Sequence, residues 1–182
     1  MLGCVDALEA VGIPCFGPRK NAAILEGSKV FSKDLMKKYG IPTAEYRVFD
    51  KAEDALEYLK EAPIPTVVKA DGLALGKGVT VAMTREEAEA AVREAMEDKK
   101  FGASGDQIVI EEYLEGPEVS VLSFTDGTTV VPMISSMDHK RAGTGIPART
   151  PAAWVRLHRT PSIRMRWLRS AWRRSFCPRS GR

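Results

Sequence analysis

Lysines and glycines gather in the segment TVVKADGLALGKGVTV, residues 66–81, in a pattern that could bind a chain of phosphates. The segment has the form of a strand ending at Lys69, a glycine-rich loop and a second strand. Glycine allows successive backbone N–H groups to point at one anion, and each lysine adds a positive charge. The candidate phosphate ligands are Lys69, Gly72, Gly76, Lys77 and Gly78. A plain β-hairpin with solvated lysines has the same composition, so both interpretations stay open at this point.

The order of residues distinguishes this loop from two common nucleotide-binding loops. It lacks the GxxxxGKS or GxxxxGKT order of a Walker loop. A strand follows it, whereas a Walker or Rossmann loop leads into the N-terminus of a helix. Both of those folds are therefore disfavoured.

Acidic residues end an apolar strand in the segment QIVIEEYLEGPEVSV, residues 107–121. Such a strand can present backbone groups to the edge of an adenine ring, while a carboxylate accepts hydrogen bonds from ribose hydroxyls. The candidates are Glu111, Glu112, Leu114 and Glu118. By composition alone a solvated acidic rim is the more common interpretation, so the neighbouring segments decide between the two.

Five blocks of sequence resemble the glycinamide ribonucleotide synthetase family of the ATP-grasp superfamily. In order they are FGPRKNAAILEGSK, KYGIPTAEYRVF, VVKADGLALGKGV, IVIEEYLEGPEVS and SSMDHKRA, and the resemblance covers residues 1–142. It implies an ATP-dependent carbon–nitrogen ligase that joins glycine to 5-phosphoribosylamine in purine synthesis. ATP would phosphorylate the glycine carboxylate, and the amine would then attack the acyl phosphate. The alternatives are a non-catalytic ATP-binding module and another ATP-grasp ligase of purine synthesis.

The resemblance also implies roles for individual residues. Lys69 would contact the α- and β-phosphates, beneath a mobile lid that contains the loop glycines and Lys77. Glu111, Glu112 and Leu114 would flank the adenine through side chain or backbone, and Glu118 would hold the ribose. The phosphoribosyl substrate would lie toward Asp138, His139, Lys140 and Arg141. No catalytic residue is assigned, because a lone His beside two cations is more often structural than catalytic.

Cofactors, partners and location follow from the same resemblance and from composition. The family uses ATP with Mg²⁺ or Mn²⁺, acts on small molecules and is monomeric, so neither nucleic acid nor membrane is expected as a partner. No apolar run approaches the roughly 20 residues that span a bilayer, which favours a cytoplasmic protein. Cys4, Cys15 and Cys177 form no CxxC pair, so neither a zinc site nor a disulfide framework is indicated.

Residues 143–182 differ in composition from the rest of the chain. They contain ten Arg and all three Trp but no Lys, Asp or Glu, although the chain holds 27 basic and 24 acidic residues. Read one base out of register, their codons permit PNTGGMG, a string that the family carries after its DHKR segment. We therefore expect an out-of-frame, disordered or irregular tail. The alternatives are an arginine-rich nucleic-acid arm and a membrane-surface helix.

Three regions are therefore expected. Residues 1–18 would be a remnant of an N-terminal lobe, residues 19–142 the ATP-grasp nucleotide-binding region, and residues 143–182 the tail. The family's metal-binding acid and Asn would fall beyond residue 142, so we expect no metal site in this chain and no ligase activity from it.

The region before the tail has an α+β pattern of helices that flank mixed or antiparallel sheets. Helices are expected at 3–11, 19–26 and 28–40, and two more are expected from two apolar stripes, namely Ala52, Ala55, Leu56 and Leu59, and Ala88, Ala91, Val92, Ala95 and Met96. Strands are expected at 46–49, 66–70, 79–83, 108–113, 119–124 and 128–134. Phe31, Leu35 and Tyr39 predict a core stripe on the third helix. Asp50 with Glu53 and Thr84 with Glu87 have the spacing of capping boxes.

Overall fold

The computed structural model describes residues 3–74, 76–116, 119–138 and 155–157. They belong to two units, Met1–Leu114 and Glu115–Arg182, which are described one at a time. Most of the predicted tail lies outside the described residues.

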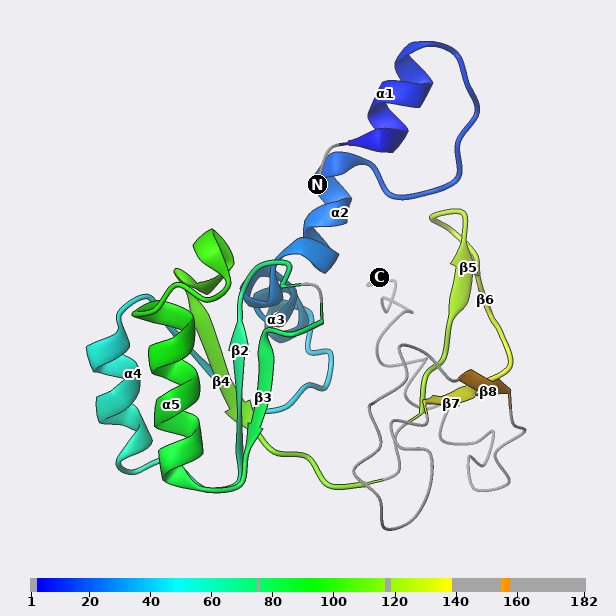
Figure 1. Ribbon diagram of the computed structural model, residues 1–182. Coiled ribbons are helices and arrows are strands. Elements are labelled where there is room, and N and C mark those ends of the chain that lie inside the picture. The colour runs from blue at the N-terminus through cyan, green and yellow to red at the C-terminus, as the bar shows by residue number, and fades with distance from the viewer. Residues whose placement is uncertain (1–2, 75, 117–118, 139–154, 158–182) are drawn as a thin grey trace, which may run out of the picture. The chain divides into compact units, whose positions relative to one another are not determined.

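A four-stranded antiparallel sheet forms the centre of the first unit (Figure 1). Its strands are β1 (Tyr46–Phe49), β2 (Thr66–Ala70), β3 (Val79–Ala82) and β4 (Ile108–Glu112), in the order β1-β4-β2-β3. β4 pairs with both β1 and β2, so segments far apart in sequence lie side by side. All four strands coincide with predicted ones, with ends that differ by at most one residue.

Two helices, α4 (Ala52–Leu59) and α5 (Arg85–Met96), cover one face of this sheet (Figure 1). The predicted stripe of α5 is fully buried, and that of α4 is buried except for Leu56, which is partly buried. They pack against Val68, Ile108 and Ile110 of the sheet in one hydrophobic core. Because successive side chains of a strand alternate, the residues between these core positions point to the opposite face.

Three helices precede the sheet: α1 (Cys4–Ala10), α2 (Lys20–Gly27) and α3 (Lys29–Lys38). The predicted core stripe of α3 is wrong, because no residue of α3 is buried, and Phe31 and Tyr39 are 43% and 63% exposed. None of the described helices is both long and apolar enough to span a membrane.

The second unit contains short strands. β5 (Ser123–Thr125) pairs with β6 (Val130–Pro132), and β7 (Ser136–Asp138) pairs with β8 (Val155–Leu157), both antiparallel. β5 and β6 are shorter than predicted, and neither β7 nor β8 was expected. The α+β class with antiparallel sheets is confirmed.

One predicted capping box forms and the other does not. At the start of α5, Thr84 Oγ1 accepts a hydrogen bond from the backbone N of Glu87 at 3.2 Å, and Glu87 Oε2 accepts one from the backbone N of Thr84 at 3.3 Å. At α4 the prediction is wrong, because the N-cap residue is Lys51 and no side chain caps the helix. Asp50 lies one residue too early to take that role.

Replacing Thr84 with Ala should lower the free energy of unfolding by about 1 kcal/mol, the usual cost of losing a hydroxyl N-cap. Thr84→Ser keeps the acceptor oxygen and is the matched control, with a stability close to that of the unaltered chain. Guanidinium denaturation followed by circular dichroism measures both. Equal stability of the Ala and Ser variants would show that this cap contributes nothing.

Candidate functional site

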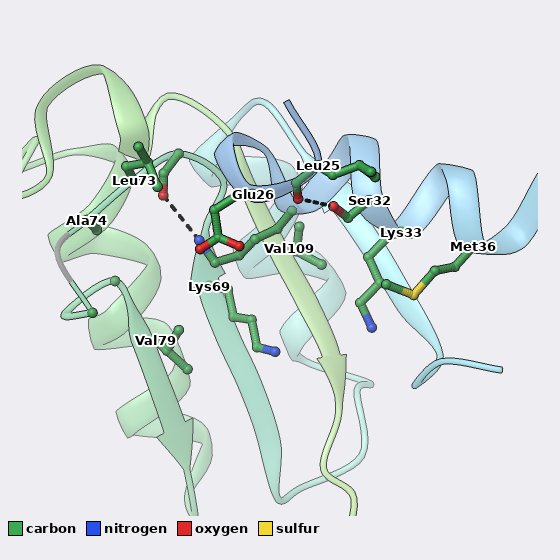
Figure 2. A pocket seen from close by; sticks show the side chains of 14 residues that line it. Leu25, Glu26, Ser32, Lys33, Met36, Lys69, Leu73, Ala74, Val79 and Val109 are labelled. Carbon is green, nitrogen blue, oxygen red and sulfur yellow. Dashed lines mark hydrogen bonds between the residues drawn. The ribbon is translucent and has the colours of Figure 1, made fainter. Parts of the chain in front are cut away.

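A pocket of about 580 Å³ opens on the sheet face that α4 and α5 leave uncovered (Figure 2). Its walls come from the end of α2, from α3, from β2 and β4 and from the loop between β2 and β3. Three lining residues are lysines, namely Lys29 and Lys33 on α3 and Lys69 on β2. Apolar lining comes from Leu25, Met36, Leu73, Val79 and Val109. Positive groups and apolar side chains therefore share one cavity.

Alternation along β2 and β4 explains why a lysine and a carboxylate occupy this face. Across the two strands Lys69 is paired with Val109, and Val67 is paired with Glu111. Side chains at paired positions point to the same face of a sheet. The neighbouring residue Ile110 points into the core. The core therefore determines which residues reach the pocket side.

Glu111 forms ion pairs with two of the three pocket lysines. Its Oε1 contacts the ammonium group of Lys69, and its Oε2 contacts that of Lys33. The Glu111 side chain is only 5% exposed, so lysines rather than water compensate its charge. Lys69 and Glu111 therefore lie together, as the sequence predicts. The carboxylate does not itself line the pocket, but it contacts two lysines that do.

The two lysines differ in their other contacts. Lys33 Nζ also donates to Thr43 Oγ1 at 2.7 Å and to Ala44 O at 3.4 Å, and its side chain is 12% exposed. Within the described residues, the ammonium group of Lys69 contacts Glu111 alone, and its side chain is 27% exposed. Since an ammonium group has three donors, Lys69 keeps two for a ligand.

The pKa values of both lysines reflect this environment. Burial lowers the pKa of Lys69, and the positive charges of Lys33 and Lys29 lower it further. Burial also lowers the pKa of Lys33. A negatively charged ligand in the pocket would oppose these effects and stabilise the protonated amines. The pocket is therefore suited to an anion.

Asp71, the residue after β2, joins the glycine loop to α3. Its Oδ1 accepts hydrogen bonds from the backbone N of Val30 at 2.7 Å and from Ser28 Oγ at 3.1 Å. The carboxylate thus caps the first turn of α3, where a negative charge also complements the helix dipole. Because α3 carries Lys29 and Lys33, this contact fixes those lysines relative to the loop.

The predicted loop glycines serve different purposes. A Cβ at Gly72 would lie 2.5 Å from Ser104 Oγ, and a Cβ at Gly78 would lie 2.6 Å from the Cβ of Ala74. These two glycines therefore permit close packing. Gly76 has a φ of 74° and open space around it, so it permits a left-handed turn instead. All three line the pocket.

Three other predicted residues have side chains away from the pocket wall. Lys77 is exposed on the loop. Glu112 points to the other face of β4 from Glu111, and its Oε2 accepts a hydrogen bond from the backbone N of Glu45 at 3.3 Å. Leu114 is 64% exposed. The adenine contacts of Glu112 and Leu114, through side chain or backbone, stay predictions.

The remaining predicted site residues cannot be placed by their side chains. Glu118, His139, Lys140 and Arg141 lie outside the described residues, and only the backbone of Asp138 is described, at the end of β7. Their contacts with ribose and with the phosphoribosyl substrate stay predictions.

Lys29 and Lys33 are pocket residues that the sequence pattern did not single out. Their i, i+4 spacing places them on one face of a helix, and this was the available signal. The apolar residues of the same helix fitted a stripe equally well and favoured the wrong face.

A divalent metal is implied by the family resemblance, so its fit to the described residues matters. Among those residues, no group of three or more His, Cys, Asp or Glu side chains could hold a metal ion. Glu111 is engaged by two lysines. The described part of the chain therefore does not fit a metal, and no step is assigned to one.

A protein-family model described as phosphoribosylglycinamide synthetase, ATP-grasp (A) domain, matches residues 27–148. The chain belongs to this family. The matched range includes the whole four-stranded sheet, the glycine loop and the three pocket lysines. The resemblance inferred from the sequence blocks is thereby confirmed.

Curated relatives of this phosphoribosylglycinamide synthetase family member are ligases. The chain is 51% identical over 174 residues to the phosphoribosylamine–glycine ligase of Pasteurella multocida, covering 91% of the chain and 40% of the relative. It is 54% identical over 145 residues to that of Salmonella typhimurium, covering 80% and 34%. The chain thus spans less than half the length of these relatives.

Solved structures agree with this membership. Phosphoribosylamine–glycine ligase from Thermotoga maritima matches with a TM-score of 0.77 and 33% identity, over 88% of this chain and 41% of that one. D-alanyl-alanine synthetase A from Vibrio cholerae matches with a TM-score of 0.67 and 17% identity, over 96% and 54%. The second likeness shows the fold alone, and together they confirm the ATP-grasp fold.

Replacing Asp71 with Ala should speed hydrogen exchange at the Val30 amide and lower the free energy of unfolding by about 1 kcal/mol, because the first turn of α3 loses its acceptor. Asp71→Asn keeps an Oδ1 acceptor and is the matched control, with a smaller loss from the missing charge. Hydrogen exchange followed by NMR measures the local effect. Unchanged exchange in Asp71→Ala would show that the carboxylate does not cap α3.

Proposed function

We propose that the chain supplies the ATP-phosphate-binding part of a phosphoribosylamine–glycine ligase, which joins glycine to 5-phosphoribosylamine in purine synthesis. The observation that supports it most is the pocket where Lys29, Lys33 and Lys69 meet beside the glycine loop, in a chain of this family. The substrates are ATP, glycine and phosphoribosylamine, and the products are glycinamide ribonucleotide, ADP and phosphate.

Two of the pocket lysines have donors to offer a phosphate chain. Lys69 keeps two, and Lys29 keeps one after donating to the carbonyl oxygens of Asp71 and Gly72 at 3.3 Å and 3.1 Å. Charges in a pocket act on phosphate oxygens more strongly than charges in bulk water. The lysine charges would also stabilise the negative charge that develops on the β-phosphate of ADP as the γ-phosphoryl group leaves.

The apolar side chains beside the lysines suit the base of the nucleotide. Val79 and Val81 are 45% and 48% exposed on the pocket face of β3, and Leu73 of the loop is 55% exposed. Exposed apolar side chains next to fixed charges are typical of a site for an amphipathic ligand. The planar adenine of ATP would cover these side chains, while the phosphates of the nucleotide extend toward Lys69.

The chemistry explains why the nucleotide comes first. A glycine carboxylate is a poor electrophile until one of its oxygens becomes a good leaving group. Transfer of the γ-phosphoryl group to that oxygen gives an acyl phosphate and ADP, and attack by the amine then forms the amide and releases phosphate.

Asp138, His139, Lys140 and Arg141 are proposed to lie toward the phosphoribosyl substrate. Mg²⁺ or Mn²⁺, a monomeric state and a cytoplasmic location belong to the same proposal.

A non-catalytic ATP-binding module is the second candidate. The pocket lysines and the glycine loop would bind a nucleotide in such a module as well. Another ATP-grasp ligase of purine synthesis has less support, because the relatives described above are phosphoribosylamine–glycine ligases. Nucleotide binding is common to all three candidates, whereas amide formation separates the module from the ligases.

Replacing Lys69 with Ala should weaken ATP binding by about 10- to 100-fold, because hydrogen bonds between charged groups contribute roughly 1.5–3 kcal/mol. Lys100→Ala is the matched control, since it removes an exposed lysine that pairs with Glu94 outside the pocket. Isothermal titration calorimetry with ATP compares the three proteins. If the unaltered chain fails to bind ATP, or if all three bind equally, the proposed site is wrong.

Residues 27–138 of this chain, transplanted into the matching segment of the Pasteurella multocida ligase, should support formation of glycinamide ribonucleotide. Lys69→Ala within the transplanted segment should lower kcat/KM for ATP by about 10- to 100-fold. Coupled detection of ADP and of the ribonucleotide measures both. A folded chimera that binds ATP and forms no amide would favour the non-catalytic module.

A further inference from the structure

We propose that Glu111 is a positioning residue whose buried carboxylate, braced by Lys33, holds the ammonium group of Lys69 toward the phosphate pocket. The proposal rests on the proposed function of this pocket as an ATP site. It differs from the role that the resemblance implies, because the carboxylate acts on a lysine instead of on the adenine.

The first step is that Glu111 is held rigidly. β4 is an inner strand of the sheet, and Glu111 is paired with Tyr46 of β1 on one side and with Val67 of β2 on the other. Its side chain is 5% exposed. A carboxylate on such a strand can move little, so a group bound to it acquires a fixed position.

The second step is that Lys33 acts as a brace and not as a ligand-binding group. Its ammonium group donates to Thr43 Oγ1 and Ala44 O and forms an ion pair with Glu111, so three contacts hold it in place. Lys33 would have to give up one of these contacts to bind a phosphate. Its charge also offsets part of the cost of burying the carboxylate.

The third step concerns Lys69, which lines the pocket directly. A free lysine side chain samples many rotamers, and fixing it costs conformational entropy when a ligand binds. The ion pair with Glu111 holds the ammonium group in advance and leaves donors for a ligand in the pocket that Lys69 lines. Binding energy is then not spent on ordering the side chain.

The fourth step is the balance of charge. Among the residues that the structure describes, the charged side chains that share the pocket region with Lys69 are Lys29 and Lys33 from α3, Glu26 from α2 and Glu111 from β4. The two neighbouring lysines already lower the pKa of Lys69. Removing the Glu111 charge would leave three ammonium groups in one pocket with less compensation.

Glu111→Gln tests the role in the full 182-residue chain without any nucleotide. The pKa of Lys69, read from the pH dependence of its acetylation by mass spectrometry, should fall by about 1–3 units, since an opposite charge in contact is lost. Glu94→Gln, the same change in the exposed pair with Lys100, is the matched control and should leave that pKa unchanged. An unchanged acetylation profile of Lys69 in Glu111→Gln would overturn the proposal.

Lys33→Gln is a second variant, which covers the case in which Glu111→Gln does not fold. It removes a positive neighbour of Lys69 and keeps the carboxylate, so the pKa of Lys69 should shift upward, opposite to the shift in Glu111→Gln. A downward or absent shift would contradict the proposed arrangement. Glu111→Asp keeps the charge on a shorter side chain and should restore most of the pKa that Glu111→Gln loses.

ATP affinity supplies the readout that separates positioning from mere structure. Protonated Lys69 binds phosphate, so affinity should fall as the pH rises through its pKa, and Glu111→Gln should move that fall to lower pH. A purely structural role would reduce the folded fraction without changing the pH at which ATP affinity falls, and that result would overturn the proposal. If the unaltered chain binds no ATP, the proposed function fails, while the acetylation profile still decides the role of Glu111.

Discussion

The alternation of side chains along β2 and β4 is the constraint on which the first unit depends. Ile110 packs in the core under the helices, and one position later Glu111 reaches Lys69 on the other face. A shift of one residue in the register would turn the carboxylate into the core and Ile110 toward the pocket. Such a shift would expose Ile110 to the pocket and lose its apolar burial. It would also bury the charge of Glu111 without a partner. The register that buries the core side chains therefore also decides which side chains face the pocket.

Regular elements of this fold are visible in the sequence because their signals are local. The stripe of α5 and its capping box at Thr84 both depend on spacing within one helix, and both are confirmed. The order of the sheet is not local, since β4 lies between β1 and β2 although it follows both in the chain. The cap of α4 shows the limit of local signals, because a one-residue change in where the helix begins removes Asp50 from the cap.

Part of the site was also predictable. Lys69, Glu111 and the pocket-lining glycines of the loop follow from the composition of two segments. Lys29 and Lys33 do not, because the face that a helix turns inward depends on its neighbours. α3 faces the side of the sheet that carries Glu111. The side of α3 toward the sheet therefore carries a lysine, Lys33, which pairs with the buried carboxylate. Hydrophobic periodicity assumes an apolar neighbour, and it fails where the neighbouring surface is charged.

The loop between β2 and β3 is held by hydrogen bonds on both sides of the pocket-lining glycine Gly72. Its stem is fixed, since the backbone N of Gly72 donates to Ser104 O at 3.2 Å, and Ser104 Oγ donates to Leu73 O at 3.0 Å. Its turn is closed by a hydrogen bond from the backbone N of Lys77 to Ala74 O at 2.9 Å, and Gly76 supplies the left-handed conformation of the turn. Ordering a residue costs about 1–2 kcal/mol of conformational entropy, so residues that these hydrogen bonds already hold add little to that cost when a ligand binds. With the stem anchored and Lys69 held by Glu111 as proposed, less of the binding energy of a phosphate chain would be spent on ordering the site.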